Sequence, residues 1–329
     1  MKKKLMLLIM FSISLCVTSC SNGETKDRKE YLQITTLSYA NGENDKEGLV
    51  LVLYHYSIKD GQMSEILRTP NDSEYPVAFA DFEKNTIYFS DCAAGDNWDN
   101  LFAYDMESKT ITQLTFGKFL FNDLFVASDN LIATAAPQYK IAIQPAIFNT
   151  ETLEFRYLDP DDDDTLSFSL SYNHATQQLL NLTCSNAEMR SYKVNAETHI
   201  RPKTLQLMNA DFSNARTIYT TDEFEICAAR QMDENRILMT VVPTMIANVP
   251  CKLKVLHLDS SEIVDMEIPG ILEIMSFFPT DDATGIYFTG KDVAHYSSLF
   301  YYDLTEQELT EIFGQYKAKD FGNIIDFVY

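Results

Sequence analysis

The feature that most constrains this fold is an internal repeat, because two distant segments carry the same series of three short apolar runs. In residues 85–114 the runs are NTIYFS, LFAYD and TITQL, separated by a loop and a polar turn. In residues 284–312 the corresponding runs are TGIYFT, LFYYD and ELTEI. Short runs rich in β-branched and aromatic residues are typical of strands joined as hairpins. The sequence therefore predicts an all-β chain built from repeated antiparallel units.

The polar turn of this repeat recurs at a regular interval along the chain. An Asp or Asn at such a turn can accept hydrogen bonds from backbone N–H groups two residues further on. Weaker copies of the hairpin occupy residues 148–153, 258–263, 56–61 and 208–211. The aligned positions are 56, 104, 148, 208, 258 and 302. Their spacing of about 44–60 residues is that of a propeller blade.

Each unit after the first also has an earlier strand, and these strands are predicted at residues 77–80, 124–127, 167–171, 225–229 and 273–278. The first unit instead begins with residues 32–39 and 50–56, and the missing strand is found at residues 324–329. We therefore predict a six-bladed β-propeller in which the C-terminal strand completes the N-terminal blade, paired with residues 50–56. Such closure protects the sheet edges that an open array would expose. A β-sandwich with irregular strands is the competing interpretation.

The N-terminus predicts export and lipidation. Three lysines precede an apolar stretch, residues 5–17, that is short for a bilayer span. The sequence VTSC at residues 17–20 then resembles a bacterial lipobox, which implies cleavage before Cys20 and a palmitate-bearing lipid anchor on that cysteine. The predicted parts are a signal peptide (1–19), the lipidated Cys20 with a tether (20–30) and one propeller domain (31–329). An ordinary signal peptide and an uncleaved membrane helix are the alternatives.

The predicted location is the cell envelope, as an outer-membrane lipoprotein. Ser21 follows the cysteine at a position where an Asp would resemble a signal for retention in the inner membrane. The face of the outer membrane on which the protein lies, periplasmic or external, is left open.

Charge excludes some partners. The chain holds 26 Lys and Arg against 48 Asp and Glu, which gives a net charge of −22. Binding to nucleic acid needs clustered Lys and Arg, and adsorption to an anionic membrane surface needs basic charge as well. The acidic balance of the chain therefore argues against both nucleic acid and an anionic membrane surface as partners. Hydrophobic residues make up 46% of the chain, enough for a packed core.

Four cysteines lie beyond the predicted lipobox: Cys92, Cys184, Cys227 and Cys251. None forms a C-x-x-C pair, which argues against a zinc or thiol-redox motif. An exported protein can form disulfides. The sequence leaves open whether these cysteines are isolated thiols or include a disulfide pair.

Familiar catalytic motifs are missing, including G-x-S-x-G, H-E-x-x-H, a phosphate-binding loop and an EF-hand. The best candidates for a binding site are instead loops on one face of the ring, since loops on a rigid scaffold commonly carry function. Trp98, His295 and Tyr296 lie in loops between the second and third strands of their units. An exposed aromatic ring there could stack on a sugar or peptide, whereas Trp98 could equally pack onto its own blade.

Carboxylates recur near the start of the first strands, at Glu74, Asp123, Asp164, Glu225, Glu273 and Asp326. If they surround the mouth of the central channel, they form an acidic site for a cation or a basic ligand, or have raised pKa values. Because side chains alternate along a strand, Asp326 could face a neighbouring blade instead. Asp123 and Asp164, at loop–strand junctions, are the stronger predictions.

Residues 159–164 (DPDDDD) form the densest acidic run. Calcium binds several carboxylate oxygens, so the run predicts either weak calcium binding or a solvated acidic loop. No other cofactor is predicted. Asp164, Thr165 and Leu166 also resemble the O-glycosylation sequon of Bacteroidota, which would place a glycan on Thr165.

Residues 278–288 (FPTDDATGIYF) followed by residues 299–303 resemble the TolB-type propeller repeat, and residues 80–89 (ADFEKNTIYF) are a degenerate copy. The resemblance implies propeller architecture over most of residues 31–329, although the turn motif is eroded in every unit. No counterpart of TolB's N-terminal domain is expected here, so its cell-envelope role is not carried over. Propellers of this type also precede serine peptidase domains, and none is expected to follow.

Together these observations predict a lipid-anchored envelope propeller that acts as a non-catalytic binding module for an envelope protein or glycan. The alternative is a carbohydrate-active enzyme, a glycoside hydrolase or polysaccharide lyase, with a carboxyl pair at the axial mouth. A structural subunit that uses the sides of its blades is a third interpretation.

Overall fold

The computed structural model describes residues 31–39, 48–73, 76–92, 98–117, 119–137, 140, 142–191, 200–243, 249–294, 297–314 and 323–328. The predicted signal peptide, Cys20 and the tether lie outside the described residues, as do Glu74, His295 and Tyr296. The described chain consists of β-strands and one short helix, α1 (Asn186–Ser191). In these parts of the chain no helix has the length and apolar character needed to cross a bilayer.

Four antiparallel sheets contain four strands each. The first contains, in spatial order, β24 (Asn323–Val328), β1 (Tyr31–Tyr39), β2 (Leu49–Ser57) and β3 (Gln62–Asn71), and the second contains β12 (Thr165–Asn173), β13 (Gln178–Ser185), β14 (Lys203–Asn209) and β15 (Arg216–Thr221). The third contains β16 (Glu225–Gln231), β17 (Arg236–Val242), β18 (Lys252–His257) and β19 (Ile263–Met266). The fourth contains β20 (Ile271–Pro279), β21 (Gly285–Asp292), β22 (Ser297–Asp303) and β23 (Leu309–Gly314).

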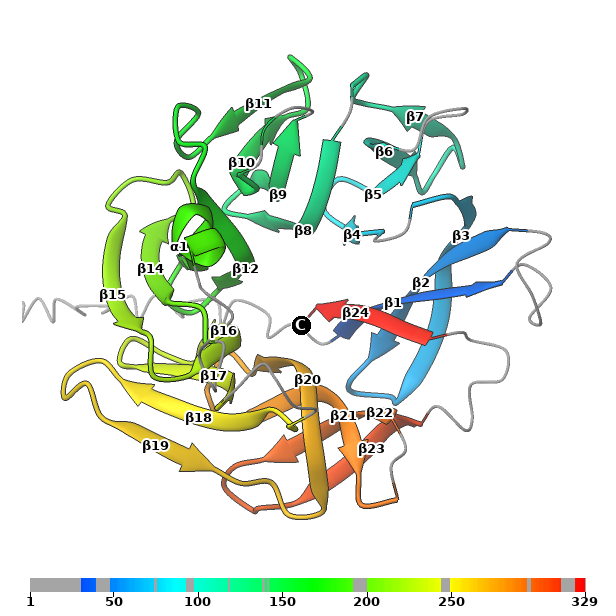
Figure 1. The fold of residues 1–329 in the computed structure, drawn as a ribbon. Coiled ribbons are helices and arrows are strands. Elements are labelled where there is room, and N and C mark those ends of the chain that lie inside the picture. The colour runs from blue at the N-terminus through cyan, green and yellow to red at the C-terminus, as the bar shows by residue number, and fades with distance from the viewer. Residues whose placement is uncertain are drawn as a thin grey trace, which may run out of the picture.

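The fifth sheet has eight strands. It contains β4 (Ala78–Asp81), β5 (Thr86–Cys92), β6 (Asp99–Asp105), β7 (Ile111–Gln113), β8 (Phe119–Ala127), β9 (Asn130–Pro137), β10 (Gln144–Asn149) and β11 (Glu154–Tyr157). Figure 1 shows the sheets arranged around a common axis in a propeller, with β4, β8, β12, β16, β20 and β24 lining the centre.

The prediction of six separate blades is wrong. The described structure has four four-stranded blades, and the strands β4–β11 belong to one continuous sheet. The joint is a single pair, Asp99 of β6 with Phe119 of β8. It forms because the three-residue strand β7 covers only Phe102–Tyr104 of β6, which leaves the edge at Asp99 free for the start of β8.

The two ends of the described chain share one sheet, but the predicted partner strand is wrong. β24 pairs with β1, in a register that sets Ile34 opposite Phe327 and Thr35 opposite Asp326, and does not pair with residues 50–56. The strand of residues 50–56 is β2, one position further out, paired to β1 on one side and to β3 on the other. The register between β24 and β1 shifts between Thr35 and Thr36.

The second strands of the blades are buried along most of their length because neighbouring sheets cover both of their faces. In β17 every residue from Ile237 to Val242 is buried, and β2 and β13 follow the same pattern. The outermost strands differ: β11 and β15 are mostly exposed or half-buried. Polar outer strands blunt the edges at which sheets would otherwise pair with another chain.

The hydrophobic core is divided into clusters that lie between neighbouring sheets. One contains Leu53 of β2 with Ile87 of β5, and another contains Ile34 of β1 with Tyr287 of β21. Similar clusters join β13 and β14 to β16 and β17, β17 and β18 to β20–β22, and β8–β10 to β12 and β13. Burial between sheets, at about 25 cal/mol per Å² of apolar surface, is therefore what holds the ring together.

The turn predicted from the repeat is confirmed. The Asp105 side chain accepts hydrogen bonds from the N–H groups of Glu107 and Ser108, at 3.0 and 2.6 Å. Asn149 and Asp303 make the same pair of bonds in their own hairpins. These side chains satisfy backbone donors that the tight turn leaves without strand partners.

Candidate functional site

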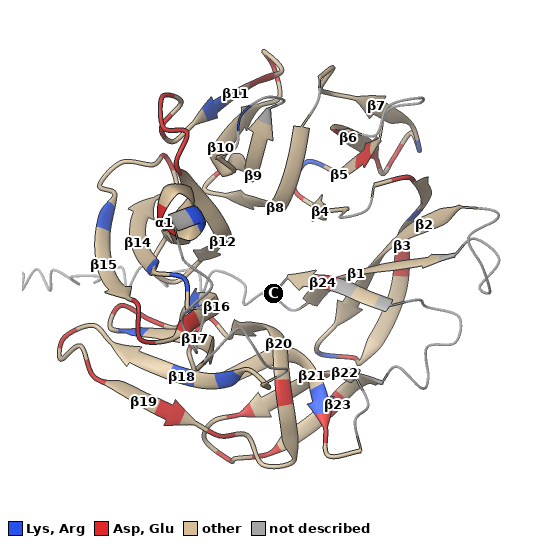
Figure 2. Cartoon of the chain, viewed as in Figure 1, with Lys and Arg blue, Asp and Glu red and all other residues tan. Residues whose placement is uncertain are grey.

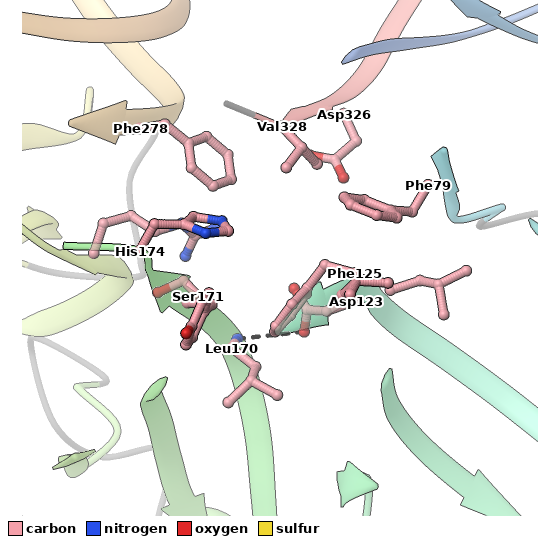
Figure 3. Close-up of a pocket in the computed structure, with 13 residues that line it drawn as sticks. Phe79, Asp123, Phe125, Leu170, Ser171, His174, Phe278, Asp326 and Val328 are labelled. Carbon is pink, nitrogen blue, oxygen red and sulfur yellow. Dashed lines mark hydrogen bonds between the residues drawn. The ribbon is translucent and has the colours of Figure 1, made fainter. Parts of the chain in front are cut away.

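The innermost strands enclose a narrow cavity on the ring axis (Figure 3). Its volume is about 40 Å³, enough for one or a few waters or a small ion. Residues of β4, β8, β12, β16, β20 and β24 line it, and its charged lining residues are Asp123, Arg230 and Asp326. The remaining lining is largely aromatic and aliphatic, with Phe79, Phe125 and Phe278 among it.

Asp123 is fixed to the strands on both sides of it. β8 has a register shift between Phe121 and Asp123, and there Asp123 N–H donates to the Thr134 hydroxyl at 2.9 Å. The same hydroxyl donates back to Asp123 Oδ2 at 2.7 Å. Oδ2 also accepts from the backbone N–H of Leu170 on β12, at 3.3 Å. Burial raises the pKa of Asp123, and Arg230 only partly offsets this.

Arg230 supplies the positive charge of the cavity. Its Nη1 donates to the Ser169 hydroxyl on β12 and to its neighbour's carbonyl, that of Ala229, the latter at 2.9 Å. Its guanidinium lies 4.7 Å from the ring centroid of Phe278 on β20, a cation–π contact. Burial lowers the pKa of Arg230, while Asp123 and Asp326 act in the opposite direction.

Asp326 of β24 is the second carboxylate of the cavity with a raised pKa. Burial first, and then the nearby charge of Asp123, raise its pKa from 3.8 to about 7, although Arg230 lowers it. The site therefore exchanges a proton near neutral pH. When Asp326 is protonated and Asp123 and Arg230 are ionised, the net charge of these three groups is zero, and when all three are ionised it is −1.

The predicted ring of carboxylates does not form as one site, although Asp123 and Asp326 do share the axial cavity. The expectation that Asp164 is a stronger candidate than Asp326 is also not met. Asp164 accepts from the Ser185 hydroxyl at 2.5 Å and from Ala187 N–H at 2.6 Å, so it caps the first turn of α1.

Glu225 is buried in a separate cluster of charges. It is 1% exposed and lies 2.7 Å from Arg201 Nη2 and 3.3 Å from Lys203 Nζ. Lys203 is equally buried, and its ammonium lies 3.1 Å from the ring centroid of Phe168. Burial lowers the pKa of Lys203, and Glu225 opposes that shift. A buried, paired carboxylate of this kind belongs to the structure of the blade.

Glu273 lines a groove of about 480 Å³. The groove runs between the start of β18, the end of β19 with its connection to β20, and the start of β20. Glu273 is half-buried and forms an ion pair with Lys291 at 2.6 Å. The groove is lined by both acidic and apolar side chains, which include Asp265, Glu267, Leu272 and Ile274.

The remaining predicted site residues that the structure describes do not line either cavity. Trp98 is half-buried immediately before β6, and Thr165 is half-buried at the start of β12. In the acidic run, Asp163 pairs with Lys140 at 2.7 Å and Asp162 accepts from the N–H groups of Asp164 and Thr165. Among the described residues no cluster of three or more His, Cys, Asp or Glu side chains is arranged to hold a metal.

Sequence reasoning missed Arg230, Lys203 and the groove. Arg230 carried a readable signal, since it is the one charged residue in the interior of the first strand EICAARQ, whose other charged residue, Glu225, begins the strand. The groove had none, because it depends on how two blades pack. Figure 2 shows that most charged segments lie in loops and outer strands, while the strands around the axis are largely uncharged.

Comparison with solved structures supports a TolB-like β-propeller fold. TolB from Acinetobacter baumannii has 10% identity and a TM-score of 0.55, covering 86% of this chain and 63% of its own. An oligogalacturonate lyase in complex with manganese has 12% identity and a TM-score of 0.52, covering 85% and 73%. A chain of the nidogen/laminin complex has 9% identity and a TM-score of 0.51, covering 85% and 91%.

At these identities the likeness concerns the fold alone, and this chain spans less than two thirds of TolB. No family model matches the sequence, and no curated protein is similar to it.

Proposed function

We propose that this protein is a cell-envelope binding module without catalytic activity, held at the outer membrane by a lipid on Cys20. Its binding site is the groove between β18–β19 and β20, and its partner is an envelope protein or glycan. The observation that carries this proposal is the size and lining of the groove. At about 480 Å³ it falls within the range of about 300–1,000 Å³ typical of ligand pockets, and it lies open at the surface.

The chemistry of the groove suits a ligand that is partly apolar and carries donor groups. Leu272 is 43% exposed at the groove, so it offers apolar contact area. Asp265 and Glu273 are paired with Lys254 and Lys291, which leaves carboxylate oxygens able to accept further hydrogen bonds from a ligand. A peptide with hydroxyl or basic side chains, or a glycan, meets both requirements.

In this proposal the axial cavity has a structural role and is not the ligand-binding site. Its charged groups link blades: Asp123 ties β8 to β12, and Arg230 ties β16 to β12. At about 40 Å³ it is smaller than a sugar ring requires, so its two carboxylates do not flank a glycosidic bond in this conformation. We propose that the cavity holds the ring in register and that calcium is not needed for this.

The competing function is that of a polysaccharide lyase, favoured by the structural likeness to an oligogalacturonate lyase that binds manganese. Incubating the protein with oligogalacturonate and Mn²⁺, and following unsaturated product by ultraviolet absorbance, tests it directly. Our proposal expects no product above the rate of a heat-denatured sample. Product that requires both the folded protein and Mn²⁺ would replace the binding proposal with an enzymatic one.

The binding proposal is tested by capture from native membranes with two matched variants. Leu272→Asp places a charge in the groove, whereas Val264→Asp places one at an equally exposed position, 43%, that does not line it. The wild type and Val264→Asp should retain the same partner, and Leu272→Asp should lose at least 10-fold of it. Equal capture by both variants would place the binding surface elsewhere.

A further inference from the structure

Two cysteines that lie 24 positions apart in the sequence meet at the edge of the groove. The sulfurs of Cys227 and Cys251 are 3.7 Å apart, which is van der Waals contact. We infer that Cys227 and Cys251 are a disulfide-forming pair that locks the wall of the groove. Formation of the disulfide is independent of the proposed function, whereas the effect of the disulfide on binding at the groove rests on that function.

The backbone brings the two residues together from different parts of one blade. The register between β16 and β17 shifts between Ile226 and Ala228, so Cys227 occupies a bulge and is exposed. Cys251 immediately precedes β18 and lines the groove. A disulfide needs its sulfurs at about 2.05 Å, so the two sulfurs, now 3.7 Å apart, must approach each other for the bond to form.

The other two described cysteines lie in different surroundings. Cys184 is buried, and burial raises the pKa of its thiol. The sulfur of Cys92 contacts the carbonyl of Asp72 at 3.5 Å and the carboxylate of Asp99 at 3.9 Å. Cys227 and Cys251 are therefore the pair that the described fold predisposes to oxidation, and Cys92 and Cys184 serve as internal controls.

The reaction is a thiol–disulfide exchange with an external disulfide, such as a low-molecular-weight disulfide or an oxidoreductase of the envelope. The neighbouring Cys227 thiol lowers the pKa of Cys251, so Cys251 reacts first as the thiolate. It attacks the oxidant and releases one reduced thiol, which leaves a mixed disulfide on Cys251. Cys227 then loses its proton, attacks the Cys251 sulfur and releases the second thiol. The protein loses two electrons and two protons, and the oxidant gains them.

The bond connects the bulge of β16 to the start of β18. The bond fixes Cys251, which begins one wall of the groove. It also closes a covalent loop of the chain that includes β17. By restricting the unfolded chain, closure of a loop of this length is expected to raise the melting temperature by about 3–8 °C. A fixed wall also reduces the ordering that a ligand must impose when it binds.

The test uses the full chain incubated with oxidised glutathione, then alkylated and digested without reduction. We expect a linked peptide joining Cys227 to Cys251, with Cys92 and Cys184 alkylated after denaturation. Dithiothreitol should lower the melting temperature of the oxidised wild type by several degrees. It should leave Cys227→Ser and Cys251→Ser unchanged, while Cys92→Ser and Cys184→Ser should still respond as the wild type does.

Three results separate the inference from the proposed function. Free, alkylatable Cys227 and Cys251 after oxidation would overturn the inference, as would a bond from either of them to Cys92 or Cys184. A linked peptide in a protein whose partner capture is unaffected by dithiothreitol would keep the bond and overturn its role in the groove. Loss of capture in Leu272→Asp with the bond intact would support the groove independently of the cysteines.

Discussion

Asp123 and Thr134 hold each other through two hydrogen bonds, one from the Asp123 backbone N–H to the hydroxyl and one from the hydroxyl back to Oδ2. Thr134 is completely buried, so its hydroxyl and the Asp123 N–H that it accepts from have no water as a substitute partner. The exchange satisfies the backbone donor that the bulge of β8 removes from the ladder, and it orients the carboxylate toward β12. One threonine thus supports both the strand and the axial site.

Thr134→Val should therefore destabilise the protein by about 1–3 kcal/mol, because it leaves a buried N–H and part of a carboxylate unsatisfied without changing volume. Urea unfolding measures the loss. Thr289→Val is a matched control, since its hydroxyl accepts from Ser276 N–H at 3.2 Å in the same kind of bulge. The control should cost less, because among the described residues that hydroxyl has no carboxylate partner. An equal cost for both variants would show that the Asp123 side-chain bond contributes nothing.

The raised pKa of Asp326 makes stability depend on pH. Its folded-state pKa of about 7 exceeds the ordinary 3.8, so between these values the folded protein holds a proton that the unfolded chain has released. Stability contributed by this group therefore falls as pH rises from about 4 to 7. Asp326→Asn should stabilise the protein by about 1–3 kcal/mol at pH 8 and by almost nothing at pH 4. The value at pH 8 is smaller than the full pKa shift would give, because Asp326 is partly exposed and solvent screens its charge.

Denaturant unfolding of the wild type and of Asp326→Asn across this pH range measures the difference directly. Asp60→Asn, in an exposed turn, serves as the control for removing one negative charge from the protein. A constant difference between the wild type and Asp326→Asn from pH 4 to pH 8 would mean that Asp326 titrates normally.

Ring closure depends on Phe327. Its side chain is completely buried in the cluster between the closing sheet and the β20–β23 blade, edge-on to Phe278 at 5.2 Å. Phe327→Ala should cost about 3–5 kcal/mol, and deletion of residues 323–329 should give an insoluble or molten protein. Phe327→Leu, which keeps more of the volume, should cost clearly less. An alanine variant that melts at the wild-type temperature would show that β24 does not close the ring.

The buried pair of Glu225 and Lys203 predicts a rescue. Glu225→Gln leaves a buried ammonium without its counter-charge and should destabilise by about 3–5 kcal/mol. Adding Lys203→Met removes the unpaired charge and should recover most of that loss. Glu273→Gln, which breaks the more exposed pair with Lys291, should cost no more than about 1 kcal/mol. Thermal or urea unfolding of the wild type and the three variants decides, and failure of the double variant to recover would contradict the charge argument.

The lipid anchor can be tested without reference to the fold. Cys20→Ala should abolish metabolic labelling with palmitate and release the protein from the membrane fraction. Because the first strand begins at Tyr31, the variant should unfold at the wild-type temperature. Label that persists in the variant would assign the lipid to another residue or exclude lipidation at Cys20.

The sequence by itself determined the features that depend on neighbours along the chain. The strands, their order and the turns at Asp105, Asn149 and Asp303 follow from local patterns, since a two-residue period and an Asx turn need only a few consecutive residues. The pairing of both chain ends in one sheet was also readable, because the first unit lacks a strand that the last residues supply.

Only the tertiary structure decided which distant groups meet. The joining of β6 to β8 through Asp99 and Phe119 depends on how far β7 extends, and the choice of β1 as the partner of β24 depends on packing around the axis. Register shifts beside Asp123 and opposite Asp326 turn these two carboxylates to one cavity with Arg230, whereas Asp164 and Glu225 find other partners. A one-residue shift reverses the direction of every following side chain. Sequence spacing therefore identified the carboxylates but did not predict which other groups each of them contacts.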